Sequence, residues 1–432
     1  MAAAFLCGVA VSTSAQNSGG ARIAPESGFT IPVNVQTPIV LNTQPDAACD
    51  LHAEGVSDAA QTLRVYANPD GYIKVHMKAR QESQDTRLQL DCAAAGEVIT
   101  YPLHLRSGSA PTDDMPAPRT VVPTPKGLQV VPALTEADAQ RLSDQELLRR
   151  GYGPRPDPVA SPDNYTRWLD LFSQPSTLLP PHSLNRPDIT HQGTQGDPDL
   201  TASSSSIWSG LQAHTTSRTY MAVESEWVVP EIPAGEPNNV TFSFTWVGLD
   251  GNGAVNLVQA GTNQAYVDID WISVASYSTW SEVLPNQPTS QGVNLSVNPS
   301  DTIFVQVWIG DANGSRDPNG AYAWFWLYDI NERQEVQFSN ALNGTFNGND
   351  AEWIMERPQQ NGVPTQLSEY VVDEFTGAYA LPTTGNWVTS GEAANRQYTM
   401  YNEDWNFPDN NELSYVVPVS PTAMIFVWLN FH

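Results

Sequence analysis

The chain has 432 residues, enough for two or three domains and a large hydrophobic core. Its formal net charge is −27, and most of the excess lies in residues 204–432, which hold five arginines, no lysine and 25 acidic side chains. This negative charge repels nucleic acid and anionic membranes, which excludes both as partners. It favours either high solubility or a protein that works in acid, where protonated carboxylates no longer repel one another.

Residues 1–15 look like the apolar part of a signal peptide, with Thr13-Ser14-Ala15 before a cleavage point. The basic stretch that normally precedes it is missing, so we expect a truncated signal and a secreted protein, extracellular or periplasmic. No other stretch is long and apolar enough to span a membrane. Export fits Cys49 and Cys92, which form one possible disulfide; two free buried thiols are the alternative.

Residues 24–110 alternate between apolar and polar side chains in short runs separated by turn residues. The runs are Thr30–Val35, Leu63–Ala67, Ile73–Met77 and Tyr101–Leu105. A period of two is typical of strands with one buried face. These runs therefore predict a small β-sandwich domain, pinned by the two cysteines if they pair.

Residues 111–203 begin as a linker rich in Pro, Ser and Thr and continue into a helical stretch. Ser143 and Glu146 form a capping-box pattern that predicts a helix ending at Gly151, and Ser161-Pro162 predicts the start of another. A short helical segment between linkers, ahead of a β domain, is typical of a removable propeptide. A plain interdomain linker has the same pattern and is the alternative.

This helical segment carries several basic side chains ahead of a strongly acidic domain. They are Arg141, Arg149, Arg150, Arg155 and Arg167. Our hypothesis is that residues 134–203 cover the acidic domain at neutral pH through ion pairs. Acid would weaken these pairs, so that the segment detaches and is cut between Pro181 and Ser206.

Residues 204–432 show strand patterns throughout, and no helical period competes with them. The clearest runs are Val240–Val247, Ala265–Trp271, Thr302–Ile309, Ala321–Leu327, Ala351–Met355 and Ala423–Leu429. Asp-Gly and Asn-Gly turn signals separate the runs. We therefore predict an all-β domain of two packed antiparallel sheets.

Few reactive side chains are available in this domain. It has no cysteine and no lysine, and its histidines are His214 and His432. Nothing near His214 in the sequence indicates a zinc site or a Ser-His-Asp triad, so we interpret it as a surface histidine. We accordingly expect no metal and no cofactor, which leaves the carboxylates as reactive groups.

The carboxylates do not form an obvious pair along the sequence. Glu352 and Glu356 share a strand face but stand about 13 Å apart, too far to share a proton or to act as a retaining glycosidase pair. Asp268 and Asp270 alternate with apolar residues, which is typical of a solvent-facing strand edge. Glu352 therefore needs a partner from another strand.

Five sequence blocks of this domain are specific when taken together. They are Trp208-Ser209-Gly210, Trp246–Gly251, Leu257–Gly261, Trp280-Ser281-Glu282 and Ala351–Glu356. In this order they resemble the glutamic peptidases, or eqolisins, over roughly residues 205–432. The resemblance implies a lectin-like sandwich of two antiparallel sheets, which agrees with the strand pattern.

The resemblance also implies which residues act. Gln259 and Glu352 match the catalytic glutamine and glutamate of the family. Supporting or substrate-binding roles are implied for four more residues: Trp246, Asp250, Glu282 and Trp353. Ser281 replaces the tyrosine that the family has before its glutamate.

Such a pair makes chemical sense for peptide hydrolysis without a metal. Glu352 can take a proton from water and pass it to the leaving amine, while Gln259 holds that water and donates an N–H to the oxyanion. We predict a secreted, acid-active endopeptidase that acts on proteins and peptides as a monomer.

Two other functions compete with this prediction. The first is a carbohydrate-binding or glycoside-hydrolysing lectin-like sandwich. The chain has 13 tryptophans for stacking on sugars, and Glu352 could pair with Glu282 or Asp268. The second is a secreted adhesion domain without catalytic activity.

Overall fold

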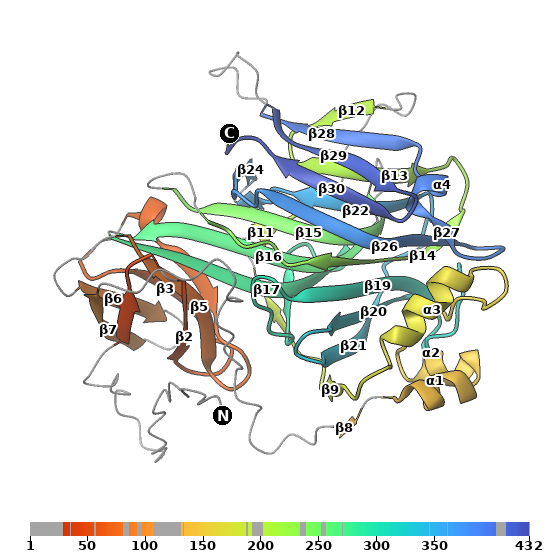
Figure 1. Ribbon diagram of the computed structural model, residues 1–432, viewed down its shortest axis with the longest axis horizontal. Coiled ribbons are helices and arrows are strands. Elements are labelled where there is room, and N and C mark those ends of the chain that lie inside the picture. Colours follow the sequence, from red (N-terminus) through yellow and green to blue (C-terminus); the bar gives the residue numbers. More distant parts are fainter. Residues whose placement is uncertain are drawn as a thin grey trace, which may run out of the picture.

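The computed structural model of the chain is shown in Figure 1. It describes residues 29–34, 36–55, 58–80, 86–92, 97–106, 131–132, 134–186, 189–191, 202–233, 239–251, 256–269, 271–344, 346–360, 362–402 and 412–431. The expected signal peptide at residues 1–15, the linker at residues 111–130, Asp270 and His432 lie outside these segments. Within the described segments, no helix has the length and apolar character needed to cross a membrane.

The N-terminal part of the chain forms strands where the alternating runs predicted them. They are β1 (Phe29–Pro32), β2 (Thr37–Asn42), β3 (Ala48–Ala53), β4 (Leu63–Tyr66), β5 (Tyr72–Ala79), β6 (Thr86–Cys92) and β7 (Glu97–Arg106). Five strands form one sheet in the order β1-β7-β6-β3-β4, and β2 pairs with β5. A disulfide joins Cys49 on β3 to Cys92 on β6.

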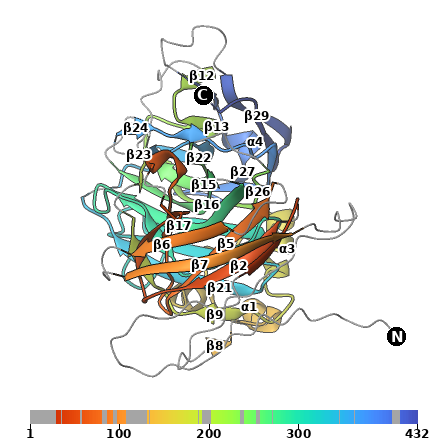
Figure 2. The ribbon, with the colours of Figure 1, turned by 90° about the vertical axis from the view of Figure 1, so that its left-hand side faces the viewer.

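The small domain is attached to the C-terminal half along a sheet edge (Figures 1 and 2). Strand β17 (Ile272–Leu284) pairs antiparallel with β5, so the β2–β5 pair extends the larger sheet. Asp268, beside this junction, forms an ion pair with Arg80 at 2.9 Å and accepts hydrogen bonds from Tyr266 and Ser273. The interpretation of Asp268 as solvent-facing is therefore wrong, because the small domain buries it.

Three short helices follow the small domain: α1 (Glu136–Arg141), α2 (Asp144–Arg149) and α3 (Pro162–Asp170). The capping box is confirmed, since Ser143 accepts the N–H of Glu146 and the Glu146 carboxylate accepts the N–H of Ser143. Gly151 follows α2 with a φ of +85°, a conformation that glycine adopts without strain. The start of α3 at Pro162 is confirmed as well.

The C-terminal half is a sandwich of two antiparallel sheets, as predicted. The layer that we call the site sheet holds, in spatial order, β13 (Trp208–His214), β22 (Asp350–Glu356), β15 (Thr241–Asp250), β16 (Leu257–Ile269) and β17. The layer that we call the back sheet holds β21 (Gln334–Ala341), β20 (Tyr322–Asp329), β19 (Thr302–Gly310), β14 (Tyr220–Val228), β26 (Val372–Pro382) and β30 (Ala423–Trp428).

Two strands connect the layers, β28 (Arg396–Tyr401) and β29 (Glu412–Ser420), since β28 pairs with β13 and β29 pairs with β30. The remaining elements are β8 (Val131–Pro132), β9 (Thr177–Leu179), β10 (Ser183–Asn185), β11 (Ile189–Thr190), β12 (Ala202–Ser205), β18 (Gln291–Val293), β23 (Gln359–Gln360), β24 (Val363–Pro364), β25 (Gln366–Leu367), β27 (Val388–Thr389), η1 (Ala59–Gln61) and α4 (Ser390–Ala393).

The back sheet has two apolar faces. On β19, Ile303, Val305 and Val307 face the core between the two sheets, whereas Phe304 and Trp308 face outward. A strand that is apolar on both faces must be covered on both. The outward face is covered by residues 134–172, so the helices form a third layer on the side away from the site sheet.

This helical layer is held by a buried core. Trp168 and Phe172 pack with Phe304, Trp308 and Trp326 of the back sheet. Figure 1 shows α3 beside β14 and β19. Aromatic side chains of this size contribute roughly 3–5 kcal/mol each when truncation leaves a cavity, so the layer is part of the fold.

The arginines of the helical segment differ in what they contact. Arg167 forms ion pairs with Glu224 and Glu226 on β14. Arg141 and Arg155 instead pair with acidic residues inside the segment, Asp138 and Asp144. Arg167 thus makes the ion pairs to the acidic domain that were predicted, whereas Arg141 and Arg155 do not, and apolar packing also holds the helices on the back sheet.

Candidate active site

A row of polar side chains crosses the outer face of the site sheet. From strand to strand, the residues directly opposite one another are Gln212 on β13, Glu352 on β22, Gly248 on β15, Gln259 on β16 and Glu282 on β17. Opposed residues on neighbouring antiparallel strands point to the same face. The row therefore brings Gln259 and Glu352 together, from strands 93 residues apart in the sequence (259 to 352). All four side chains are fully buried.

Gly248 keeps open the space between the two predicted catalytic residues. Neighbouring strands lie about 4.8 Å apart, so the Cα atoms of Glu352 and Gln259 are roughly 10 Å apart. A Cβ at Gly248 would lie 2.8 Å from the ring of Trp246 and 3.2 Å from the Cβ of Gln259. A side chain there would fill the space between Glu352 and Gln259.

Glu352 keeps one oxygen available. Its Oε1 accepts a hydrogen bond from Gln212 Nε2 at 2.5 Å, whereas its Oε2 has no partner among the described residues. Gln212 is held in turn by Tyr398 at 3.0 Å and by Arg396 at 3.3 Å. Burial, and then the neighbouring Asp350, raise the pKa of Glu352 well above its ordinary value. A carboxylate with raised proton affinity and an unpartnered oxygen is suited to act as a base.

Gln259 is oriented by Glu282. Its Nε2 donates to Glu282 Oε2 at 2.8 Å, while its Oε1 has no partner in the described part of the chain. A carboxamide nitrogen carries two hydrogens, so one N–H remains for another acceptor. Burial raises the pKa of Glu282 to about 7, although His191 and Gln259 oppose the shift. The supporting role expected for Glu282 has a physical basis in this contact.

Trp246 forms a wall of the site. It lies on the same face of β15 as Gly248, two residues away, and its Nε1 donates to Glu356 Oε2 at 2.7 Å. Trp208 packs edge-on against it with ring centroids 5.0 Å apart. The tryptophan thus fixes Glu356 on the same face as Glu352, as their four-residue spacing predicted.

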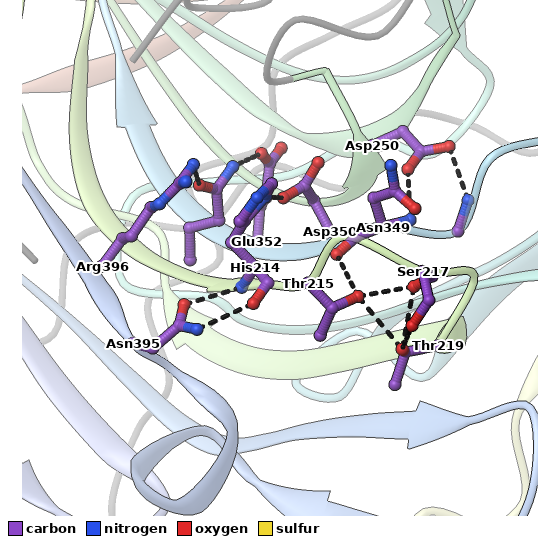
Figure 3. Close-up of polar contacts among 12 residues, drawn as sticks. His214, Thr215, Ser217, Thr219, Asp250, Asn349, Asp350, Glu352, Asn395 and Arg396 are labelled. Atoms are coloured by element: carbon purple, nitrogen blue, oxygen red, sulfur yellow. Dashed lines mark hydrogen bonds and ion pairs between the residues drawn. The ribbon is translucent and has the colours of Figure 1, made fainter. Parts of the chain in front are cut away.

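Asp250 supports the strand that carries Glu352. Its carboxylate accepts the backbone N–H groups of Asn347, Gly348 and Asn349 at 3.1, 2.9 and 2.7 Å. Figure 3 shows Asp250 beside Asn349. These residues come directly before β22. Asp250 therefore fixes the turn from which Glu352 enters the sheet.

Trp353 does not reach this face. Its side chain lies in the core between the two sheets, where its Nε1 donates to the backbone oxygen of Glu224 at 3.1 Å. The substrate-binding role expected for it is wrong, because successive residues of a strand point to opposite faces and Glu352 already points outward.

The carboxylates do not fit a glycosidase. Glu282 and Glu352 are separated by three strand spacings, roughly 14 Å, whereas the two carboxyl groups of glycosidases lie about 5–9.5 Å apart. Asp268 is an odd number of residues from Gln259 along β16 and faces the other side. Among the described residues, no group of three or more His, Cys, Asp or Glu side chains is placed to hold a metal ion.

Two histidines on this face were not predicted to belong to the site. His214 is not a surface histidine: its side chain is 17% exposed, and its Nδ1 lies 2.6 Å from Asp350 Oδ1. Asp350 and Glu352 are two residues apart on one strand, so their side chains point to the same face. This spacing could have indicated that Asp350, the partner of His214, lies beside Glu352. His191 comes from outside the predicted β domain, and the sequence around it has no pattern that indicates a place in the site.

Residues 183–186 and 189–191 lie beside the site sheet and bring His191 onto its outer face. Their strands β10 and β11 pair with β18 and β23. His191 is fully buried, stacks on Trp280 with ring centroids 4.2 Å apart and an interplanar angle of 7°, and bonds to Glu356 at 3.0 Å. Burial opposes the charging of His191, but Glu356 and Glu282 outweigh it and raise its pKa. The segment thus covers part of the face that carries Glu352 and Gln259.

Several buried carboxyls predict a pH dependence of stability. Burial is the main cause that raises the pKa of Glu282 and Asp373 to about 7 and that of Asp329 and Asp350 to about 8. A carboxyl with a raised pKa in the folded state favours folding while it is protonated, so this stability is lost as pH rises through 7 and 8.

We therefore expect the melting temperature to be at least roughly 5 °C higher at pH 4–5 than at pH 8. Differential scanning calorimetry across this range measures it. Asp329→Asn, which removes one of these carboxyls far from the row, should reduce the difference. A melting temperature that is equal or higher at pH 8 would contradict the prediction.

Comparison with known proteins shows a similarity over part of the chain. The model of the Peptidase A4 family matches residues 206–406. Among solved structures, scytalido-glutamic peptidase with a peptide-based transition state analogue is 18% identical, covers 52% of this chain and 98% of its own, and has a TM-score of 0.39. Aspergilloglutamic peptidase from Aspergillus niger is 20% identical, covers 44% of this chain and 99% of its own, and has a TM-score of 0.36.

A further solved structure, SCP-B of the Eqolisin family in complex with the tripeptide Ala-Ile-His, is 18% identical. It covers 52% of this chain and 98% of its own, with a TM-score of 0.38. No curated protein matches the chain.

Proposed function

We propose that the protein is a glutamic-type endopeptidase whose catalytic pair is Glu352 and Gln259, since the model of the Peptidase A4 family matches residues 206–406. The observation that carries this proposal is the row on the site sheet. It places a carboxylate and a carboxamide on either side of Gly248, each with one oxygen that has no partner among the described residues.

In the proposed reaction, Glu352 removes a proton from a water molecule that Gln259 Oε1 helps to hold. The water oxygen bonds to the carbonyl carbon of the substrate, and the second N–H of the Gln259 carboxamide stabilises the oxyanion. Glu352 then gives the proton to the leaving nitrogen, and the C–N bond breaks. Glu282 keeps the carboxamide in the orientation that both steps need.

We also propose that the full-length chain is an inactive precursor. Both catalytic side chains are fully buried, and His191 fills the face between Trp280 and Glu356. Acid would protonate Glu282, whose pKa is about 7, and thereby weaken the hold on the His191 imidazolium. Residues 183–191 would then leave, and the chain would be cut between Pro181 and Ser206.

The helical layer has a different fate in this proposal. The aromatic core of this layer and the partly buried Arg167 do not depend on exposed ion pairs, so residues 134–172 should stay on the back sheet after the cut. The proposal therefore differs from the hypothesis based on the arginines, in which residues 134–203 detach as one piece.

The setting of the activity is part of the same proposal. The Cys49–Cys92 disulfide and the acidic C-terminal half support a secreted enzyme, extracellular or periplasmic, that acts on proteins and peptides in acid. We propose that it works as a monomer, without nucleic acid or membrane partners.

An acid incubation tests the proposed function. At pH 3–4 the purified chain should shorten on a gel, give a new N-terminus between Pro181 and Ser206 by mass spectrometry, and digest casein but not glucan. EDTA, thiol reagents and fluorophosphonates should not inhibit it, because the pair uses neither a metal nor a thiol nor a serine. The fragment with residues 134–172 should co-elute with the catalytic domain in size-exclusion chromatography.

Glu352→Gln, kept under the same conditions, should remain full-length. Strong inhibition by chelators would overturn the Glu/Gln mechanism. A wild-type chain that stays full-length and digests casein equally well at pH 7 would overturn both the precursor and the acid activity.

A further inference from the structure

The small domain contacts the segment that brings His191 to the catalytic face. We call this segment, residues 182–186 and 189–191, the strap. Its strand β10 pairs with β18, and β18 pairs with β17, so the strap adds a strand to the edge of the site sheet. A strand of three residues forms few backbone hydrogen bonds, so side-chain contacts at its two ends have a large share in holding it.

Arg186 lies between the small domain and the site sheet at one end of β10. Its guanidinium carbon is 5.1 Å from the centroid of the Tyr66 ring on β4, and its Nη1 donates to Ser278 Oγ on β17 at 2.9 Å. The residue is only 7% exposed. A guanidinium over an aromatic ring is attracted more strongly when water is excluded from the contact. Arg186 therefore joins the strap to both domains.

Gly292 on β18 leaves room for this guanidinium. A Cβ there would lie 2.7 Å from both Nε and Nη2 of Arg186. The φ of Gly292 is outside the left-handed region, so glycine is needed here for space and not for the backbone conformation. The slot for Arg186 thus has one wall in the small domain and one in the site sheet.

The other end of β10 also contacts the small domain. His182 Nε2 is 2.9 Å from Oδ1 of Asp46, which lies in the turn before β3. Both side chains are partly exposed, and exposed pairs of this kind contribute little. A cavity of about 130 Å³, lined by Tyr66 and Leu184 among others, lies between the small domain and the strap. Contacts at the ends of β10 therefore join the two parts, and Arg186 is the stronger of them.

We propose that the small domain is a clamp for the strap, with the Tyr66 ring holding Arg186 as its main contact. His191 is five residues after Arg186 (186 to 191), so a fixed Arg186 limits how far His191 can move from the catalytic face. The clamp gives a role to the small domain, which lies outside residues 206–406 that match the family model. Its consequence for activation rests on the proposed function, in which the full-length chain is a precursor.

Hydrogen exchange of the full chain at pH 7, followed by mass spectrometry, tests the clamp without any activity. The N–H of Arg186 bonds to Ser290 at 2.9 Å, so exchange there reports the opening of the strap. Tyr66→Leu removes the ring and Arg186→Leu removes the guanidinium. Each should speed exchange in the peptide of residues 182–191 by about 2- to 30-fold, the range that a cation–π contact predicts. The double variant should exchange no faster than the faster single variant, because both changes remove one contact.

Two further variants separate this contact from a general loss of structure. Tyr66→Phe keeps the ring and should exchange like the wild type, whereas Gly292→Ala displaces the guanidinium from outside the small domain and should speed exchange. Arg141→Leu is the matched control, because Arg141 is exposed and pairs with Asp138 inside the helical segment. Unchanged exchange in both Arg186→Leu and Gly292→Ala would overturn the clamp, as would additive effects of Tyr66→Leu and Arg186→Leu.

The consequence for activation is measured on chains that cannot cut themselves. In a Glu352→Gln background at pH 4, a trace of activated wild-type enzyme should cut the Tyr66→Leu chain between Pro181 and Ser206 about 2- to 30-fold faster than the chain with Tyr66. Equal rates of cutting would overturn the role of the clamp in activation. A Glu352→Gln chain that shortens without added enzyme would instead overturn the proposed function, so the two failures are distinguishable.

Discussion

Glu352→Gln should abolish peptide hydrolysis, by at least about a thousandfold in kcat/KM, and leave the fold intact. A carboxamide cannot accept the proton of the attacking water or return it to the leaving amine, and each of these transfers contributes roughly 10²–10⁴-fold. Glutamine has the same shape as glutamate. Its side-chain oxygen can still accept the hydrogen bond that Gln212 Nε2 donates to Glu352 Oε1 at 2.5 Å. Casein hydrolysis at pH 3–4 and a thermal melt measure the two parts of the prediction.

The matched control is the same substitution at another buried glutamate. Glu335 lies on β21 in the back sheet, where it accepts hydrogen bonds from Ser176 and Trp326. Glu335→Gln should keep nearly all activity, because this carboxyl is on the other layer of the sandwich. Activity of more than a few per cent in Glu352→Gln, with a normal melt, would show that another residue is the base.

Gln259→Ala should cost about 2–4 kcal/mol of transition-state stabilisation, which is roughly a 30- to 1000-fold loss in kcat. The oxyanion exists only in the transition state, so KM should change much less than kcat. The carboxyl of Glu282, which loses its Gln259 partner at 2.8 Å, should then take up a proton at higher pH. Steady-state kinetics on a short fluorogenic peptide measure kcat and KM separately.

Gln264→Ala provides the control for this substitution. Gln264 is a buried glutamine on the same strand, and its odd spacing from Gln259 places it on the opposite face. Its kcat should stay within a fewfold of wild type. A Gln259→Ala enzyme with unchanged kcat and a raised KM would mean that the carboxamide binds the ground state and does not stabilise the oxyanion.

The sequence by itself was sufficient for features that depend on neighbours along the chain. The period of two predicted the strands of both β domains, and the Ser143 cap predicted a helix start, because hydrogen bonds and side-chain directions over a few residues decide both. The same alternation places Trp353 on the face opposite Glu352, so that error could have been avoided from the sequence. The resemblance supplied Gln259 and Glu352 as a pair, but not the distance between them.

Only the tertiary structure decided what meets across the sheets. Strand register places Gly248 between Glu352 and Gln259 and sets His214 against Asp350, and register depends on pairings between distant segments. The position of the helical layer on the back sheet, and of His191 over the catalytic face, likewise depends on which apolar or charged surface offers the best cover. A local pattern shows that a face must be buried, but the partner that buries it is chosen by the packing of the whole chain.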